Sequence, residues 1–215
     1  MHRRKGDIIA AVVALAVLIV ATLMALSDNV AQWEISVFRF VNDWPDFVFP
    51  IIWPFMQYGG FLTIPIVSAV AFYFKRKRLA IKLLGGGVGI YLAAIVIKNF
   101  VERGRPVDLL TGVNSREIFT GGSFGFTSGH AAVAATIVTY TLVYLPKRWR
   151  IASIAVLAIV AVGRLYVSAH FPLDIIGGAA LGIAVASAIN FIFGVSPDKK
   201  PAHQRAKSAE AGGKK

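Results

Sequence analysis

The sequence contains no cysteine among its 215 residues, and only 16% of its residues are charged. The absence of cysteine excludes disulfides, thiolate nucleophiles, zinc–thiolate sites and iron–sulfur clusters. The charged fraction is well below the roughly 25% that is typical of soluble domains. The chain is instead 56% hydrophobic, with a mean hydropathy of +0.66, and apolar runs of membrane-spanning length recur along it. These features predict one multi-spanning membrane domain.

The formal net charge is +12, which in a soluble protein would suggest a nucleic-acid partner. That interpretation requires the basic residues to gather on one accessible surface. Here Lys and Arg separate the apolar runs instead, a pattern that reports membrane topology. We therefore expect a lipid bilayer, and no nucleic acid, around this chain.

Six apolar runs are expected to cross the membrane, which predicts an all-α bundle of six transmembrane helices. The runs cover about 8–26, 47–74, 79–97, 128–145, 151–166 and 172–193. The first run is about 28 Å long as a helix, enough to cross the hydrocarbon core. Its basic start also resembles a secretory signal peptide, but the run is long for a cleaved segment, so we expect it to be retained.

Residues 27–46 are mixed in polarity and predict an amphipathic interfacial helix between the first two spans. Apolar residues recur there at helical spacing, and tryptophans such as Trp33 and Trp44 favour the headgroup region. The membrane domain is expected to cover 1–195. The segment 196–215 is basic and polar and predicts a disordered cytoplasmic tail.

The distribution of Lys and Arg predicts a multi-pass protein of the plasma membrane with both termini in the cytoplasm. Segments 1–7, 75–82, 146–150 and 194–215 carry 3, 5, 3 and 6 Lys or Arg residues, which is 17 of the 23 in the chain. This is a strong positive-inside bias. The remaining six fall at the outer face and need another explanation; they are Arg39, Lys98, Arg103, Arg105, Arg116 and Arg164.

Polar side chains gather in three segments at that outer face. In the first, Lys98 and Arg105 are seven residues apart at the end of the third span, so both could lie on one helix face. The second is Thr-Ser-Gly-His at 127–130, directly before an apolar helix. Ser128 is a natural N-cap there, and the free backbone N–H groups of a helix start suit an anion.

The third segment spans the turn between the last two helices and carries Arg164, His170 and Asp174. Asp174 follows His170 by four residues and can therefore reach its imidazole. The outer face thus holds three cations, two histidines, one carboxylate and a helix N-terminus. Three converging cations repel one another unless a dianion binds between them, and phosphate suits both the arginine fork and the lysine ammonium.

Two histidines beside a bound phosphate favour phosphoryl transfer with one nucleophile and one general acid. No metal ion is required, because the cations can neutralise the charge that spreads over the phosphoryl oxygens. Taken singly, each cation is more often an interfacial anchor, and Asp174 alone could be a partner of the helix dipole. Their joint occurrence on one face favours the catalytic interpretation.

In order and spacing, these residues resemble the three motifs of the type 2 phosphatidic acid phosphatase superfamily, whose members are integral membrane lipid phosphatases. The resemblance covers 98–174 and consists of Lys-x6-Arg-Pro, Ser-Gly-His and Arg-x5-His-x3-Asp. It implies phosphate binding by three cations and by the backbone of the helix start, that is, by Lys98, Arg105, Arg164, Ser128 and Gly129.

The resemblance also implies roles for the remaining motif residues, with no cofactor and no metal. His130 would protonate the leaving oxygen, His170 would attack phosphorus to form a phosphohistidine, and Asp174 would orient His170. Two positions depart from the family pattern: Thr127 stands where proline is common, and Gly163 where serine is common. The missing serine hydroxyl bears on efficiency rather than on the chemistry.

The expected activity is hydrolysis of a lipid phosphate monoester or lipid diphosphate at the extracytoplasmic face. The resemblance implies undecaprenyl diphosphate, phosphatidylglycerol phosphate and phosphatidate as candidate substrates. Two alternatives stay open: a lipid phosphotransferase with the same site, and a transporter of anions or lipid phosphates whose histidines only bind. Arg103, Arg116 and Glu117 match no motif residue; solvated loop charge is their expected role, with selection of the lipid headgroup as the alternative.

Overall fold

The computed structural model describes residues 4–27, 29–117 and 124–195, so the predicted tail lies outside the described residues. The described elements are helical, which confirms the all-α class. They are α1 (Lys5–Ala25), α2 (Gln32–Asn42), α3 (Phe49–Met56), α4 (Thr63–Tyr73), α5 (Lys77–Val101), α6 (Pro106–Leu109), α7 (Gly129–Thr141), α8 (Lys147–Tyr166) and α9 (Pro172–Phe193), with the 3-10 turns η1 (Asp46–Val48) and η2 (Gln57–Gly59).

Four stretches of the described chain are long and apolar enough to cross a membrane: Lys5–Ala25, Lys77–Leu109, Lys147–Tyr166 and Pro172–Phe193. The second predicted span is a broken one, because Asp46–Gly59 and Thr63–Tyr73 meet at a bend of 67°. Counting that pair once gives five spans. The fourth predicted span is shorter than expected: α7 has 13 residues and is about 20 Å long, less than the hydrocarbon core. The count of six therefore stays a prediction.

The break in the second span lies just after Gly59, between Asp46–Gly59 and Thr63–Tyr73. Pro54 lies earlier, inside α3. Gly59 follows in η2, and a Cβ on it would lie only 2.5 Å from the carbonyl oxygen of His130. Glycine therefore allows the bend to rest directly on the first turn of α7, which places the α3–α4 connection beside the predicted site.

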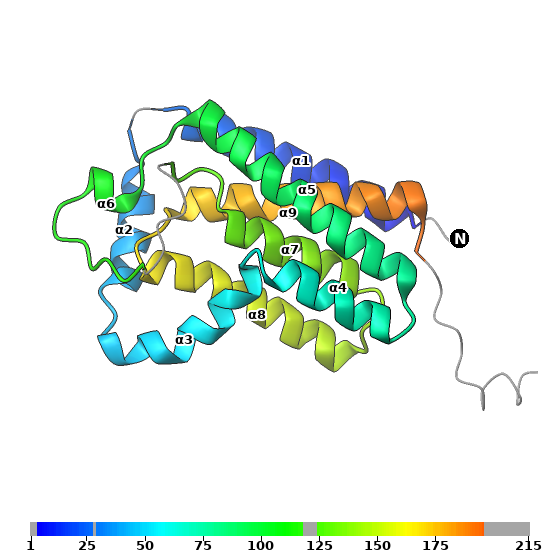
Figure 1. Cartoon of the computed structure of the whole chain (residues 1–215). Coiled ribbons are helices and arrows are strands. Elements are labelled where there is room, and N and C mark those ends of the chain that lie inside the picture. Colours follow the sequence, from blue (N-terminus) through cyan, green and yellow to red (C-terminus); the bar gives the residue numbers. More distant parts are fainter. Residues whose placement is uncertain (1–3, 28, 118–123, 196–215) are drawn as a thin grey trace, which may run out of the picture.

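The helix α7 lies in the middle of the bundle and packs against α9, α5 and α8 (Figure 1). Its residues from Ala131 to Val138 are all buried, so α7 is enclosed by protein and not by lipid. The helix α9 packs closely because Gly178 and Gly182 face the carbonyl oxygens of Ser128 and Ala132, where a Cβ would collide. This contact fixes the start of α9 next to the start of α7.

The helix α2 crosses one end of the bundle (Figure 1), inside the segment predicted to be interfacial. Trp33 and Phe40 are exposed, whereas Phe38 is buried and packs edge-on against the ring of Phe171 at 5.6 Å. Glu34, one turn before Phe38, is also buried. The inner face of α2 thus brings a carboxylate into the protein core.

The described parts of the four basic segments lie at one end of the bundle (Figure 1). The carboxyl ends of α5 and α8 and the amino ends of α7 and α9 point toward the opposite end. All three motif segments therefore share one end of the molecule, away from the basic segments.

Candidate active site

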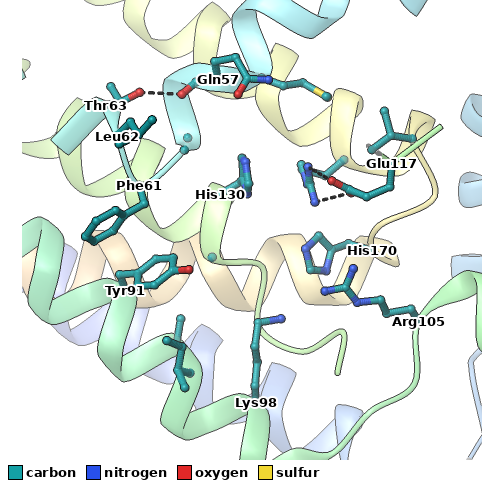
Figure 2. Close-up of a pocket in the computed structure, with 18 of the residues that line it drawn as sticks. Gln57, Phe61, Leu62, Thr63, Tyr91, Lys98, Arg105, Glu117, His130 and His170 are labelled. Carbon is teal, nitrogen blue, oxygen red and sulfur yellow. Dashed lines mark hydrogen bonds and ion pairs between the residues drawn. The ribbon is translucent and has the colours of Figure 1, made fainter. Parts of the chain in front are cut away.

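A cavity of about 1000 Å³ lies among the bend, α5, the start of α7 and the end of α8. Figure 2 places Phe61 and Tyr91 on one side of it, Arg105 and His170 on the other, and His130 between them. Six of the eight predicted site residues line this cavity: Lys98, Arg105, Gly129, His130, Arg164 and His170. The structure thus brings together the side chains that the motifs separate in sequence.

Lys98 and Arg105 reach the cavity from two elements and not from one helix face, so that part of the prediction is wrong. Lys98 lies in the last turn of α5, and its Nζ donates to the carbonyl oxygens of Phe124 and Gly125 at 2.8 and 3.1 Å. The helix then ends, because Glu102 adopts a left-handed conformation with φ of +52°. The turn carries Arg105 back over the cavity, where Figure 2 shows it beside His170.

Arg164 lies in the last turn of α8, and its guanidinium binds the carboxylate of Glu117 in a two-point pair. The nitrogen–oxygen distances are 2.6 and 3.3 Å. The preceding Gly163 packs against α3, where a Cβ would collide with Met56 and Ile52. The serine that is common in the family at this position would therefore require Met56 to move.

The start of α7 has the predicted N-cap. The Ser128 Oγ accepts a hydrogen bond from the backbone N–H of Ala131 at 3.4 Å, and the Ser128 N–H donates to the Asp174 carbonyl at 2.9 Å. Ser128 is fully buried behind the cavity wall, while Gly129 and His130 line the cavity. The side chain of Ser128 therefore organises the helix start, and the backbone at Gly129 faces the cavity.

His170 lies between α8 and α9 and is 3% exposed. Its Nδ1 is 3.7 Å from Oδ2 of Asp174, longer than a hydrogen bond. The same Oδ2 accepts the backbone N–H of Phe171 at 2.8 Å, which ties the carboxylate to the start of α9. Burial, and then the charges of the nearby lysine and arginines, hold the pKa of His170 well below its usual range. The imidazole is therefore neutral at neutral pH, the form that can act as a nucleophile.

Arg103 is not a solvated loop charge, as the sequence suggested, but the centre of a buried ion network. It is 6% exposed, and Glu34 is 1% exposed. The Arg103 guanidinium binds Oε1 of Glu34 at 2.6 Å and Oδ1 of Asp174 at 2.8 Å. Glu34 also accepts the backbone N–H of Leu173 at 3.0 Å. Through Arg103, the α5–α6 turn and Glu34 of α2 are thus connected to Asp174, the carboxylate beside His170.

A sequence signal for Glu34 does exist. Glu34, Phe38 and Val41 follow the i, i+4, i+7 spacing of one helix face, so a carboxylate lies in line with apolar residues that are buried in the structure. A charge on a buried face needs a partner of opposite sign. That partner, Arg103, is 69 residues away in the chain, and no local pattern points to it.

Arg116 and Glu117 also depart from the expectation of solvated loop charge. Arg116 donates to the carbonyl oxygens of Asn42, Trp44 and Tyr166 and to the carboxylate of Asp46, at 2.8 to 3.2 Å. Its guanidinium lies over the ring of Tyr166, 4.3 Å from the centroid. These contacts fasten the loop to α2 and α8 and hold the next residue, Glu117, in the cavity wall.

Among the described residues, no group of three His, Cys, Asp or Glu side chains is placed to hold a metal ion. The groups that can neutralise a bound phosphate in the cavity are instead the lysine and arginine side chains of the chain itself. Such preorganised cations can stabilise charge as it develops on phosphoryl oxygens.

The fold and the cavity together define a helical membrane protein with a cavity lined by cationic side chains and two histidines. A family model described as PAP2 superfamily matches residues 79–196, more than half of the chain, so the chain belongs to the PAP2 superfamily. This confirms the resemblance seen in the motifs. The family membership and the phosphatase names of its relatives support a phosphate-ester hydrolase.

Three known proteins are similar to this chain in sequence or in fold. An undecaprenyl-diphosphatase of Sulfolobus acidocaldarius is 26% identical over 145 residues, which cover 67% of this chain and 70% of that protein. The crystal structure of Aquifex aeolicus LpxE has a TM-score of 0.67 at 25% identity, covering 75% of this chain and 96% of that one. A transmembrane PAP2-type phosphatidylglycerolphosphate phosphatase of Bacillus subtilis has a TM-score of 0.71 at 20% identity, covering 88% and 98%, and supports the fold.

Proposed function

We propose that this chain is a membrane lipid phosphatase that hydrolyses a lipid phosphate monoester or lipid diphosphate at the extracytoplasmic face. The observation that carries the proposal is the two-sided cavity. Phe61 and Leu62 lie on one side of it, and Arg105 and His170 lie on the other. A substrate with an apolar chain and a phosphate group matches both sides at once.

In the proposed first step, Lys98, Arg105 and Arg164 bind the phosphate oxygens and neutralise their charge. The neutral imidazole of His170 attacks phosphorus, so that a phosphorus–nitrogen bond forms while the bond from phosphorus to the lipid oxygen breaks. His130 donates a proton to the departing lipid oxygen. Both histidines face the cavity in Figure 2, which supports a part for each of them in the reaction.

In the second step, water attacks the phosphohistidine. His130 takes a proton from that water, phosphorus bonds to the new oxygen, and His170 leaves as the free imidazole. Asp174 orients His170 throughout, and the 3.7 Å separation shortens to a hydrogen bond when substrate is bound. No metal ion enters either step.

We infer that the bundle crosses the plasma membrane six times, with the bent α3–α4 pair as the second span and the short α7 as the fourth. The clustering of basic segments at one end of the bundle supports a cytoplasmic location for that end. The cavity then faces the extracytoplasmic leaflet, α2 lies at the interface, and the membrane domain ends near residue 195.

The test is phosphate release by the purified protein in non-ionic detergent, without any gradient. Phosphatidate, phosphatidylglycerol phosphate and undecaprenyl diphosphate are supplied separately, each with and without a chelator. We expect release from at least one lipid, unchanged by the chelator and abolished in His170→Gln. Release from none of the three would contradict the proposal and favour the transporter alternative.

A second assay separates hydrolysis from phosphotransfer. The products are analysed with glycerol or another alcohol added as an acceptor. A hydrolase yields inorganic phosphate as the main product, whereas a phosphotransferase yields the phosphorylated alcohol at the expense of inorganic phosphate. Predominant transfer at modest alcohol concentration would replace the hydrolase assignment.

A further inference from the structure

Glu117 occupies part of the proposed phosphate site. Among the described residues that line the cavity it carries the only carboxylate, and Figure 2 shows it on the same side as His170 and Arg105. Its two oxygens pair with the two terminal nitrogens of Arg164 at 2.6 and 3.3 Å. This is the same fork with which an arginine binds a phosphate bidentately, so the carboxylate and a phosphate compete for the same two donors.

The pair is buried and the carboxylate is held in place. The side chain of Arg164 is 6% exposed and that of Glu117 is 12% exposed. The preceding Arg116 donates its backbone N–H to the Val167 carbonyl at 3.3 Å, and its side chain is bound by the end of α2 and by Tyr166. Glu117 therefore stays close to Arg164 even when a ligand displaces it, and it is always available to return.

We propose that Glu117 is a built-in counter-ion that occupies the Arg164 fork in the resting enzyme, is displaced by the substrate phosphate, and returns to release inorganic phosphate. This inference rests on the proposed phosphatase function. Without such a competitor, three converging cations would hold the dianionic product tightly. Binding that is equally strong for substrate and product lowers KM without raising kcat, and slow product release limits turnover in many enzymes. By competing for Arg164, the Glu117 carboxylate prevents slow release of the product phosphate.

A competitor and a merely structural ion pair predict opposite signs. A resident competitor weakens the binding of every anion by a common factor. Its removal therefore tightens the binding of substrate and of inorganic phosphate by the same factor. Loss of a structural pair leaves Arg164 buried without its partner and misplaced, so binding of both becomes weaker. The direction of the change in KM and in the inhibition constant of phosphate therefore separates the two.

The experiment uses Glu117→Gln, with Glu102→Gln as a matched control that removes an exposed carboxylate near the same end of the protein. Turnover of a lipid phosphate is measured in detergent micelles with increasing inorganic phosphate. For Glu117→Gln we expect KM and the phosphate inhibition constant to fall by a similar factor of at least about ten, the worth of one charged hydrogen bond. We expect kcat to fall as well, because product release becomes slower, and Glu102→Gln to match the wild type.

Glu117→Asp keeps the charge on a shorter side chain and is expected to lie between the wild type and Glu117→Gln. A thermal melt with and without phosphate provides a readout that needs no turnover: phosphate should stabilise Glu117→Gln more than the wild type. Unchanged or higher constants in a folded Glu117→Gln would overturn the inference. Wild-type phosphate release from the lipid decides the proposed function separately, whatever the Glu117 variants show.

Discussion

The guanidinium of Arg103 donates a 2.8 Å hydrogen bond to Oδ1 of Asp174, the carboxylate whose other oxygen faces His170. Because Glu34 binds the same guanidinium, two buried carboxylates share one positive charge. On the proposed mechanism, Arg103 is a positioning residue: it touches neither substrate nor the reacting atoms but fixes the group that orients the nucleophile.

Arg103→Lys is therefore expected to lower kcat about tenfold or more while leaving KM nearly unchanged, because the cavity cations remain in place. Glu34→Gln should have a smaller effect of the same kind, since an amide oxygen still accepts a hydrogen bond. Complete truncation is avoided, because breaking a buried ion pair costs roughly 3–5 kcal/mol of stability. Steady-state kinetics and a thermal melt check both variants.

The control for this pair is Arg39→Lys. Arg39 lies at the same end of the protein, and its guanidinium donates to the loop carbonyls of Thr111 and Gly112. It should retain wild-type kcat. A rise in KM with unchanged kcat in Arg103→Lys would assign that residue to substrate binding and contradict the positioning role.

The two histidines should respond differently to the leaving group. A lipid alkoxide leaves poorly and needs a proton, whereas a nitrophenolate leaves well without one. His130→Ala should therefore retain a larger fraction of wild-type activity on an aryl phosphate than on phosphatidate, where loss of a general acid costs about 10²–10⁴-fold. His170→Ala should lose activity on both substrates. Equal losses for His130→Ala on the two substrates would exclude the acid role.

The lowered pKa of His170 makes a prediction about pH. A lowered pKa means that the folded protein binds the proton weakly, so the neutral imidazole persists as the pH falls below about 6.5, the ordinary histidine value. Stability should fall as the pH drops below about 6.5, because the unfolded chain then binds a proton that the folded protein does not. Activity should be lost only at still lower pH, where the folded imidazole itself is protonated. Nitrogen NMR of histidine-labelled protein, with His170→Gln to assign the signal, should show no titration of His170 above pH 6.5. A midpoint at or above 6.5 would contradict the prediction.

The proposed sidedness can be tested because the chain has no native cysteine. Single cysteines are introduced at Ser115, an exposed residue directly before Arg116 and Glu117, and at Ser208 in the basic tail. An impermeant thiol reagent should label Ser115→Cys in intact cells, and Ser208→Cys only after the membrane is opened. The reverse pattern would place the cavity in the cytoplasm.

Local patterns were sufficient for the residues whose positions depend on their own element. The N-cap at Ser128 follows from the sequence at the start of α7, and the closeness of Asp174 to His170 follows from their spacing at the start of α9. The ion pairs that local patterns missed depend instead on packing between distant segments. Glu34 meets Arg103 across 69 residues, and Glu117 meets Arg164 across 47.

Helix lengths show the same limit. Hydropathy alone made 47–74 one span, whereas the structure bends it just after Gly59, a residue that packs against the backbone of His130. The apolar run 128–145 predicted a full span, yet α7 ends at Thr141. Its apolar character reflects burial among other helices, which a hydropathy window cannot distinguish from contact with lipid.

The wall on the apolar side of the cavity includes side chains that the protein itself leaves exposed. Leu62 and Ile66 both line the cavity, yet they are 74% and 60% exposed. On the proposed function, the acyl or isoprenoid chains of neighbouring lipids finish that wall. A substrate then enters by sideways diffusion within its leaflet, and the concentration that governs turnover is its mole fraction in the bilayer. The part of its tail beyond the first few carbons stays outside the protein, so the enzyme does not discriminate between substrates by tail length.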